Sequence, residues 1–157
     1  DKKLPQSIIL RIKERQPFSV FCNTEEPEKC FFMDENGIIF ESLKNIPEDI
    51  IIIKKELNDK DVFTTGNNVV GKNIVDIIFK VQKNLKDNFQ IDVKEAFVSN
   101  PLIFKTSENW QIYFDPDSDV DLQITKMNVL LKDEIPVNDR KKIQYIYLQY
   151  KDRAYYK

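Results

Sequence analysis

The chain has 157 residues, with 24 basic and 26 acidic side chains and a formal net charge of −2. It contains no histidine, which excludes a Ser-His-Asp triad, a Cys-His dyad and a histidine-bound zinc ion. Two cysteines are too few for an all-thiolate zinc site, and the balanced charge argues against nucleic-acid binding. No apolar run approaches the ~18 residues of a membrane span, and no signal peptide is visible. The length suits one domain with its own core, and we expect it to be excised from a longer protein.

The N-terminal part has the patterns of strands and of one tight turn. Residues 7–21 alternate in hydrophobicity, which predicts a half-buried strand. Pro17 interrupts this strand and indicates an edge, a bend or a domain junction, because proline cannot donate to a sheet ladder. Residues 30–40 predict a hairpin, whose turn is Asn36-Gly37 because both residues tolerate a positive φ.

The clearest helix of the sequence is predicted over residues 73–88, where apolar side chains recur at helical spacing opposite a lysine-rich face. Before it, residues 50–54 predict a short buried strand and residues 62–65 are a candidate for another. After it, residues 89–97 predict a strand. Residues 102–105 and 110–114 then form a predicted hairpin around 107–109.

A second helix is predicted from a cap at Asp117 or Ser118 to about Lys132, with the apolar stripe Val120, Ile124, Met127 and Leu131. Its acidic first turn suits the positive end of the helix dipole. A strand over residues 143–151 and a final piece over 153–156 close the chain. The order predicts an α+β fold, a mainly antiparallel sheet with two helices, in place of regular βαβ alternation.

Two segments approach known binding motifs without completing them. Residues 66–73 have the two glycines and the lysine of a phosphate-binding loop, but Asn73 stands where a magnesium-binding Ser or Thr is required. The alternative is a polar loop in which Gly71 eases the turn into the helix. Residues 115–121 space their aspartates like a calcium loop, but Val120 and Lys126 replace the required glycine and glutamate. Those acids also suit a helix N-terminus.

The two cysteines, Cys22 and Cys30, lie at the ends of neighbouring predicted strands, with a polar loop containing Pro27 between them. If the strands pair, the cysteines face each other at bridging distance. Such a disulfide requires an oxidising compartment. The alternative is two reduced, buried cysteines in a cytosolic protein.

Tyrosine is concentrated at the end of the chain. Five of the six tyrosines fall in the last thirteen residues: Tyr145, Tyr147, Tyr150, Tyr155 and Tyr156. Tyrosine suits a partly exposed strand, and this accounts for the pattern without a partner. Tyrosine is also enriched at protein interfaces, and a last strand near a sheet edge can accept a strand from another chain. The residues alone leave both interpretations open.

Three segments follow one another in a characteristic order: Glu14-Arg15-Gln16-Pro17, then Asp34, Gly37 and Phe40 spaced by three, then residues 145–150 with 153–157. Together they resemble the FtsQ/DivIB family of bacterial cell-division proteins. In that family E-R-x-P ends the POTRA domain, D-x-x-G-x-x-F forms a hairpin, and Y-I-D-L-R-F followed by R-V-Y-Y-K closes the β domain. The family's Asp and Arg in the closing strand are Tyr147 and Gln149 here, so their charge pairing is lost or replaced.

The resemblance implies that residues 1–17 are the last POTRA strand and the junction, and that residues 18–157 are the β domain. It implies a non-catalytic scaffold for septum formation, without a cofactor, in a single-pass membrane protein whose N-terminal anchoring helix this chain lacks. The domain would be extracytoplasmic, which favours the Cys22–Cys30 disulfide. Its partners would be the coiled-coil proteins FtsB and FtsL. The partner-binding residues implied are Tyr145, Tyr147, Gln149, Arg153, Ala154, Tyr155 and Tyr156.

Two other functions remain open at this point. One is a nucleotide-binding enzyme that uses residues 66–73. The other is a POTRA-linked binding module in envelope assembly outside cell division, which the sequence barely separates from a division scaffold.

Overall fold

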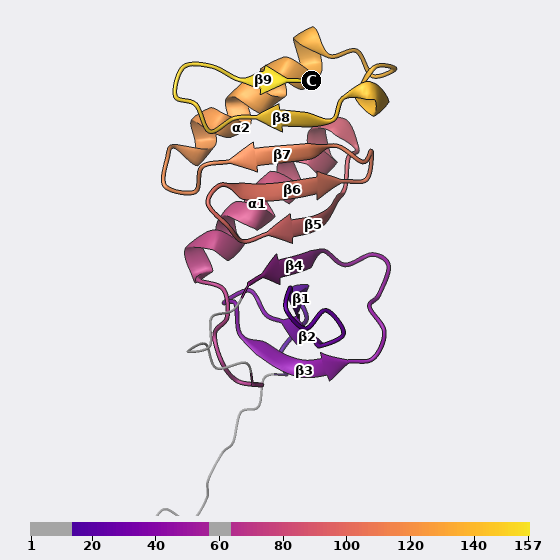
Figure 1. Cartoon of the computed structure of the whole chain (residues 1–157), viewed down its shortest axis with the longest axis vertical. Coiled ribbons are helices and arrows are strands. Elements are labelled where there is room, and N and C mark those ends of the chain that lie inside the picture. The colour runs from indigo at the N-terminus through magenta and orange to yellow at the C-terminus, as the bar shows by residue number, and fades with distance from the viewer. Residues whose placement is uncertain (1–13, 57–63) are drawn as a thin grey trace, which may run out of the picture.

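The computed structural model describes residues 14–56 and 64–157. Within these residues, nine strands form one sheet in the order β3-β2-β1-β4-β5-β6-β7-β8-β9, and two α-helices lie against it (Figure 1). The elements are β1 Ser19–Asn23, β2 Cys30–Met33, β3 Ile39–Leu43, β4 Ile52–Lys55, α1 Lys72–Phe89, β5 Val93–Phe97, β6 Leu102–Thr106, β7 Gln111–Phe114, α2 Val120–Val129, β8 Tyr145–Tyr147 and β9 Tyr155–Tyr156. A π-helical turn, Leu130–Glu134, extends α2, and a short 3₁₀-helix, Arg140–Lys142, precedes β8. The α+β class with two helices is therefore confirmed.

The sheet is more mixed than the sequence predicts. Antiparallel pairing joins β1 to β2, β2 to β3, β5 to β6, β6 to β7 and β8 to β9. The pairs β1–β4, β4–β5 and β7–β8 are parallel. Each helix connects two adjacent parallel strands, since α1 lies between β4 and β5 and α2 between β7 and β8. Antiparallel pairs still outnumber parallel ones, so the predicted mainly antiparallel sheet without regular βαβ alternation is confirmed, and the two βαβ units are a feature that the sequence did not predict.

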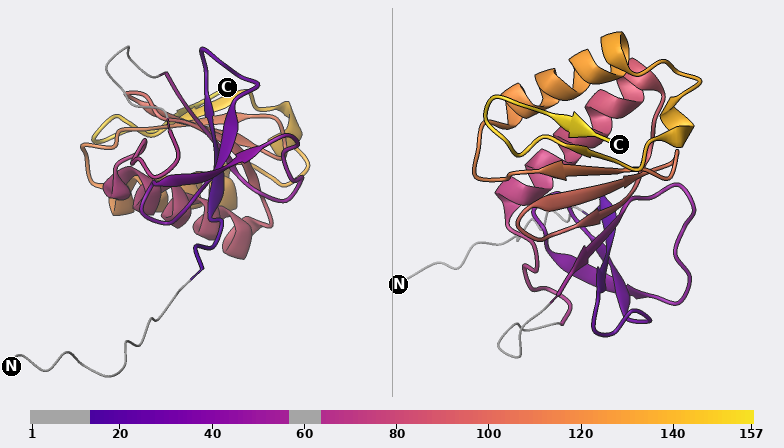
Figure 2. Two further views of the ribbon diagram at one scale, coloured as in Figure 1. Left: turned by 90° about the horizontal axis from the view of Figure 1, so that it is seen from below. Right: turned by 45° about the horizontal axis from the view of Figure 1, so that its top comes forward.

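These two crossovers explain why both helices cover the same face. The strand pairings show that β4, β5, β7 and β8 point in the same direction. Both helical crossovers lead to the neighbouring strand on the side of β9. Connections of this kind are right-handed almost without exception, so they place their helices on one side. Figure 2 shows α1 and α2 side by side on that face, with the opposite face of the sheet uncovered.

The main core lies between the helices and the sheet. Helix α1 buries Val75, Ile78, Val81 and Leu85. The last three belong to the apolar stripe that the helical spacing predicts, whereas its other members, Ile74 and Ile77, are half-buried and pack at the margin of the core. The sheet contributes alternate residues of its strands, and Trp110, immediately before β7, is the largest of the fully buried side chains. Burying a side chain of this kind contributes roughly 1.5–3 kcal/mol, so this layer holds the helices on the sheet. At its far end α1 continues to Phe89, and Gln90 takes the left-handed conformation of a C-cap. The strand predicted from residue 89 therefore begins only at Val93.

The N-cap of helix α2 lies two residues after Asp117, the earlier of the two predicted caps. The cap is Asp119, whose Oδ1 accepts a hydrogen bond from the Leu122 N–H at 2.9 Å. Ser118 instead donates its hydroxyl to the Asp115 carboxylate. Asp117 lies outside the helix because its N–H donates to the same Asp115 side chain. The prediction of Asp117 or Ser118 as the cap is therefore wrong.

The N-terminal predictions are only partly covered by the described residues. Residues 14–18 have no regular secondary structure, so the strand predicted over 7–21 is wrong there, on both sides of Pro17. Its last three residues, 19–21, are confirmed as the start of β1. Its first half, and with it most of the proposed POTRA strand, lies outside the described residues. The candidate strand over 62–65 lies partly outside them as well, and residues 64 and 65 are not in a strand.

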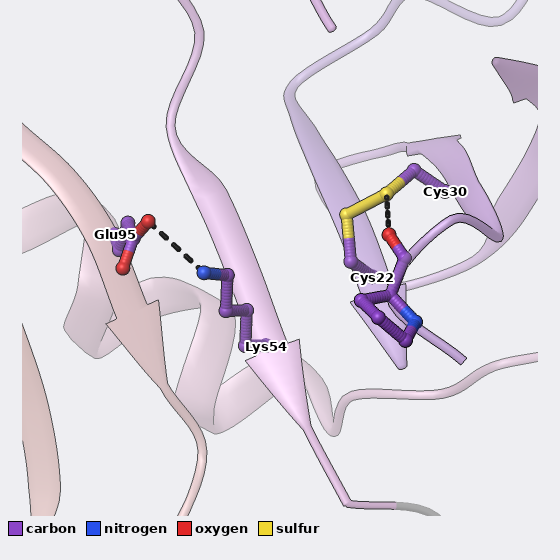
Figure 3. The surroundings of a disulfide bond; sticks show 5 residues. Cys22, Cys30, Lys54 and Glu95 are labelled. Carbon is purple, nitrogen blue, oxygen red and sulfur yellow. Dashed lines mark hydrogen bonds and ion pairs between the residues drawn. A yellow bond between two sulfur atoms is a disulfide. The ribbon is translucent and has the colours of Figure 1, made fainter. Parts of the chain in front are cut away.

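The predicted disulfide is present. Cys22 and Cys30 are direct partners in the β1–β2 ladder and are bonded to each other (Figure 3). Both are buried, together with Val20, in a small second cluster on the sheet face that carries no helix. Beside them Lys54 on β4 pairs with Glu95 on β5 at 3.0 Å. The disulfide therefore closes the β1–β2 hairpin at the end away from the chain's N-terminal entry.

Candidate protein-binding edge

The uncovered face of the sheet carries a cluster of three tyrosines near the C-terminal edge. We define the tyrosine cluster as Tyr113, Tyr145 and Tyr147. The Tyr113 and Tyr147 ring centroids are 4.4 Å apart, and those of Tyr145 and Tyr147 are 4.6 Å apart. Tyr113 and Tyr147 are direct partners in the parallel β7–β8 ladder, while Ile146 between the two β8 tyrosines is fully buried on the helix side. The predicted Tyr145 and Tyr147 are thus brought together on one half-buried surface.

Tyr113 was not among the residues predicted from the sequence, although it is at the centre of the cluster. Its hydroxyl lies 2.7 Å from Gln111 Oε1 and donates to it. Burial raises the pKa of Tyr113, and the neighbouring hydroxyl groups of Tyr147 and Tyr145 raise it further. The alternation of residues 110–114 indicated its face, but only the β7–β8 pairing brings it against the C-terminal tyrosines.

The outermost strand, β9, offers backbone groups to another chain. Lys157 and Tyr145 exchange both backbone hydrogen bonds, with N···O distances of 3.2 and 3.3 Å. Opposed residues on antiparallel strands alternate between hydrogen-bonded and non-hydrogen-bonded pairs. The next pair, Ile146 with Tyr156, is therefore a non-hydrogen-bonded pair. The N–H and C=O of Tyr156 therefore point away from β8, towards the open edge. The side chains of Tyr155 and Tyr156 are 46% and 44% exposed, which leaves this edge accessible.

The opposite edge of the sheet is partly covered. At the start of β3 the Gly66 N–H donates to the Ile39 carbonyl, and the Ile39 N–H donates to Asn67. Asn68 also forms a β-bridge with Ile38. Proteins commonly protect a strand edge in this way against unwanted pairing. Nothing in the described part of the chain covers β9 similarly, so the two edges differ in their availability.

The other predicted partner-binding residues surround β9. Arg153 is exposed, and a hydrogen bond with Tyr155 raises its pKa. Ala154 is half-buried and packs against the main core, so it anchors the start of β9. Gln149 is half-buried and lies beyond the end of β8. Tyr155 stacks edge-on against Tyr150, with centroids 5.4 Å apart.

The strand predicted over residues 143–151 is shorter than expected, because a helix side chain forms hydrogen bonds with the backbone of its second half. Strand β8 ends at Tyr147. The Lys126 Nζ on α2 donates to the carbonyl oxygens of Leu148 and Tyr150, at 2.9 and 2.6 Å. Burial lowers the pKa of Lys126, and Asp152 partly offsets this. These contacts draw the chain off the sheet before it returns as β9.

The C-terminal segment is basic although the whole chain is slightly acidic. Residues 140–157 contain six basic side chains and one acidic side chain, against the net charge of −2 for all 157 residues. This imbalance was visible in the sequence but was hidden by the balanced total. A surface built from this segment favours an acidic partner.

The phosphate-loop-like segment has a structural role in this fold. Its Gly66 and Val69 N–H groups donate to carbonyl oxygens of the β2–β3 hairpin. A phosphate cradle needs such N–H groups to be free. Lys72 pairs with Asp76 one turn along α1, at 3.1 Å, and residues 64 and 65 do not form a strand leading into the loop. The segment fastens α1 to the hairpin.

The calcium-loop-like aspartates are each engaged separately. Asp115 accepts hydrogen bonds within its own turn, and Asp117 accepts one from the Asn100 side-chain amide. Asp119 caps α2, and Asp121 pairs with Lys80 of α1 at 2.5 Å. Among the described residues, no three or more Cys, Asp or Glu side chains are grouped so that they would hold a metal ion.

In the described ranges, no helix has both the length and the apolar character needed to cross a membrane. No protein-family model matches this chain, and no significant match is found among the curated proteins.

Proposed function

We propose that this chain is the β domain of a non-catalytic division scaffold of the FtsQ/DivIB type, which binds a segment of an FtsB-like or FtsL-like partner by strand addition at β9. The observation that carries this proposal is the open edge at Tyr156, whose N–H and C=O face away from β8. A strand that pairs there makes main-chain hydrogen bonds of about 1 kcal/mol each. Main-chain pairing needs no catalytic group, in keeping with a sequence without histidine.

Side chains around the edge supply contact area and specificity. Tyr155 and Tyr156 are exposed on β9, and the tyrosine cluster lies next to them on the uncovered face. Buried tyrosines are frequent energetic centres of interfaces because the ring buries area while the hydroxyl stays hydrogen-bonded. The basic residues 140–157 would attract acidic side chains on the partner strand and raise its association rate at low salt.

Contacts between the motifs support the family resemblance. Arg15, from the E-R-x-P segment, pairs with Asp34 of the hairpin motif at 2.8 Å. Its guanidinium carbon also lies 6.0 Å from the centre of the Phe40 ring. Asp34 is buried and accepts the N–H groups of Asn36 and Ile38, which shapes the turn. The residues of two motifs that are separate in sequence therefore form one structural unit at the proposed junction.

An extracytoplasmic location in a single-pass membrane protein belongs to the same proposal. The Cys22–Cys30 disulfide is compatible with it, because disulfides persist in oxidising compartments. Residues 1–17 would then lead from a POTRA domain into this domain.

The direct test compares Tyr156→Pro with Tyr156→Ala in binding to a peptide from an FtsB homologue, measured by titration calorimetry. Proline removes the outward N–H and blocks a docking strand, but it leaves the β8–β9 hydrogen bonds in place. We expect Tyr156→Ala to weaken binding by about tenfold. We expect Tyr156→Pro to weaken it by roughly a further tenfold or more.

The matched control is Val137→Ala, which removes an exposed apolar side chain away from β9 and should leave the affinity unchanged. Equal affinities for Tyr156→Pro and Tyr156→Ala would show that main-chain pairing at β9 is not the binding mode. A full chain that captures neither FtsB-like nor FtsL-like proteins in a pull-down would contradict the division role. Capture of an envelope-assembly protein at the same edge would assign the domain to the alternative module.

A further inference from the structure

The C-terminal ends of the two helices enclose a hollow that the proposed binding edge does not use. It has a volume of about 660 Å³ and is lined by residues of α1, of α2 and the π-helical turn that extends it, and of the loop that leads to β8. Its lining contains two cations, Lys132 and Arg140, two amides, Asn88 and Asn128, and no acidic side chain. Its remaining walls are apolar. A hollow of this composition is suited to an anion that carries an apolar group.

Arg140 is the unusual member of this lining. Its side chain is buried, with only 6% of the residue exposed. It donates one hydrogen bond, from Nη2 to the Leu131 carbonyl at 3.1 Å, and its guanidinium lies 5.2 Å from the Phe89 ring centre. In the described part of the chain it has no carboxylate partner, and its Nε has no hydrogen-bond partner. A buried arginine is normally paired, because an unpaired charge away from water is costly.

Asn128 provides a second unsatisfied group beside it. Its side-chain oxygen is buried and has no partner. The two ends of an amide are interchangeable by rotation, so Asn128 can present N–H donors at the same place. Lys132 is exposed at the rim and has no ion pair within the described residues. The lining therefore has an excess of hydrogen-bond donors and positive charge.

We propose that this hollow binds an organic carboxylate with a short apolar tail. The carboxylate accepts hydrogen bonds from the Arg140 guanidinium and from Asn128, since arginine and carboxylate match in a two-pronged geometry. The tail lies against Ile135 and Val137, which line the same hollow. The hollow shares no residue with β9, so the test of carboxylate binding is independent of the test of the scaffold function.

Isovalerate is the probe, and isovaleramide is its neutral counterpart of the same shape. Titration into the isotope-labelled full chain, followed by amide NMR, should give saturable shifts at Asn128 and Arg140 with isovalerate. The amide should bind at least about tenfold more weakly, because it lacks the charge that pairs with arginine. Acetate should also bind more weakly, because it lacks the tail. Equal binding of isovalerate and isovaleramide, or an absence of saturable shifts, would overturn the proposal. Equal binding of acetate and isovalerate would contradict the claim that the ligand carries an apolar tail.

Two variants locate the site. Arg140→Gln should abolish the shifts, but it also removes a buried contact with Leu131. Val137→Asp therefore provides the second test, because Val137 is 66% exposed and its replacement leaves the core intact. A negative charge at this rim should weaken isovalerate binding about tenfold relative to the neutral Val137→Asn. Unchanged binding in a folded Val137→Asp protein would place the probe elsewhere and contradict the assignment.

Discussion

Lys126 on α2 and Tyr150, in the turn between β8 and β9, are joined by a hydrogen bond of 2.6 Å from the Lys126 ammonium to the Tyr150 carbonyl oxygen. The same ammonium donates to the Leu148 carbonyl. One helix side chain thus satisfies two carbonyl groups that leave the sheet. The position of β9, and with it the open edge at Tyr156, depends on this contact.

Lys126→Met keeps the apolar stem of the side chain and removes all of its donors. We expect a loss of about 1–3 kcal/mol in the free energy of unfolding, because two carbonyl groups lose a charged partner. Hydrogen exchange should show faster opening of the β8–β9 turn than of α1, and peptide binding at β9 should weaken. The control is Lys83→Met, on the exposed side of α1. Equal exchange rates at the turn in the two variants would show that Lys126 does not hold it.

The disulfide gives a prediction for redox conditions. Cys22 and Cys30 are eight positions apart, and closing so short a loop is worth about 2.5 kcal/mol in the chain-entropy model. Reductant should lower the free energy of unfolding of the native chain by about that amount. It should have no effect on a Cys22→Ala, Cys30→Ala double variant. Two titratable thiols in the unreduced, denatured protein would contradict the bond.

Gly37 and Gly66 form a matched pair for testing the β2–β3 turn. Both have a positive φ, so alanine costs backbone strain of about 1 kcal/mol at each. A Cβ on Gly37 would lie 1.8 Å from the Val70 carbonyl oxygen, whereas a Cβ on Gly66 meets nothing within 4 Å. We expect Gly37→Ala to be more destabilising than Gly66→Ala by about 1–3 kcal/mol in denaturant unfolding. Equal losses would mean that the hairpin and the loop before α1 separate at little cost.

The raised pKa of Tyr113 leads us to expect that the free energy of unfolding falls at alkaline pH. Its pKa in the folded protein is raised above 10.0, chiefly by burial and then by Tyr147. Above the pKa of the unfolded chain, the folded state retains the proton that the unfolded state releases. The stabilisation is therefore complete below about pH 10 and is lost as the pH rises through the folded pKa.

Unfolding free energies of the native chain and of Tyr113→Phe, measured across this range, should reveal the effect as a difference. The native chain should lose more stability than the variant, and the subtraction removes the opposite contribution of Lys126, whose pKa is lowered. Parallel curves for the two proteins would mean that Tyr113 titrates normally.

The local sequence pattern predicted those structural elements that are formed by residues close to one another in the sequence. The spacing of apolar residues in α1, the Asn36-Gly37 turn and the hairpin of β6 and β7 follow from nearby residues, and so does the Cys22–Cys30 pairing across adjacent strands. Element ends were less predictable where another side chain competes for the same backbone or hydroxyl groups. Lys126 shortens β8 in this way. The Asp115 carboxylate accepts hydrogen bonds from the Asp117 N–H and the Ser118 hydroxyl, the two residues that were expected to cap α2.

The sequence by itself indicated an α+β chain without histidine chemistry, a candidate disulfide between Cys22 and Cys30 and a tyrosine-rich, basic C-terminal end. Only the tertiary structure decided that β7 and β8 run parallel, that Tyr113 joins Tyr145 and Tyr147, and that the backbone of Tyr156 faces outwards. The physical reason is that side-chain periodicity records which face of a strand is buried. Which strand lies next to it depends on crossovers through helices, and these are set by packing of the whole core.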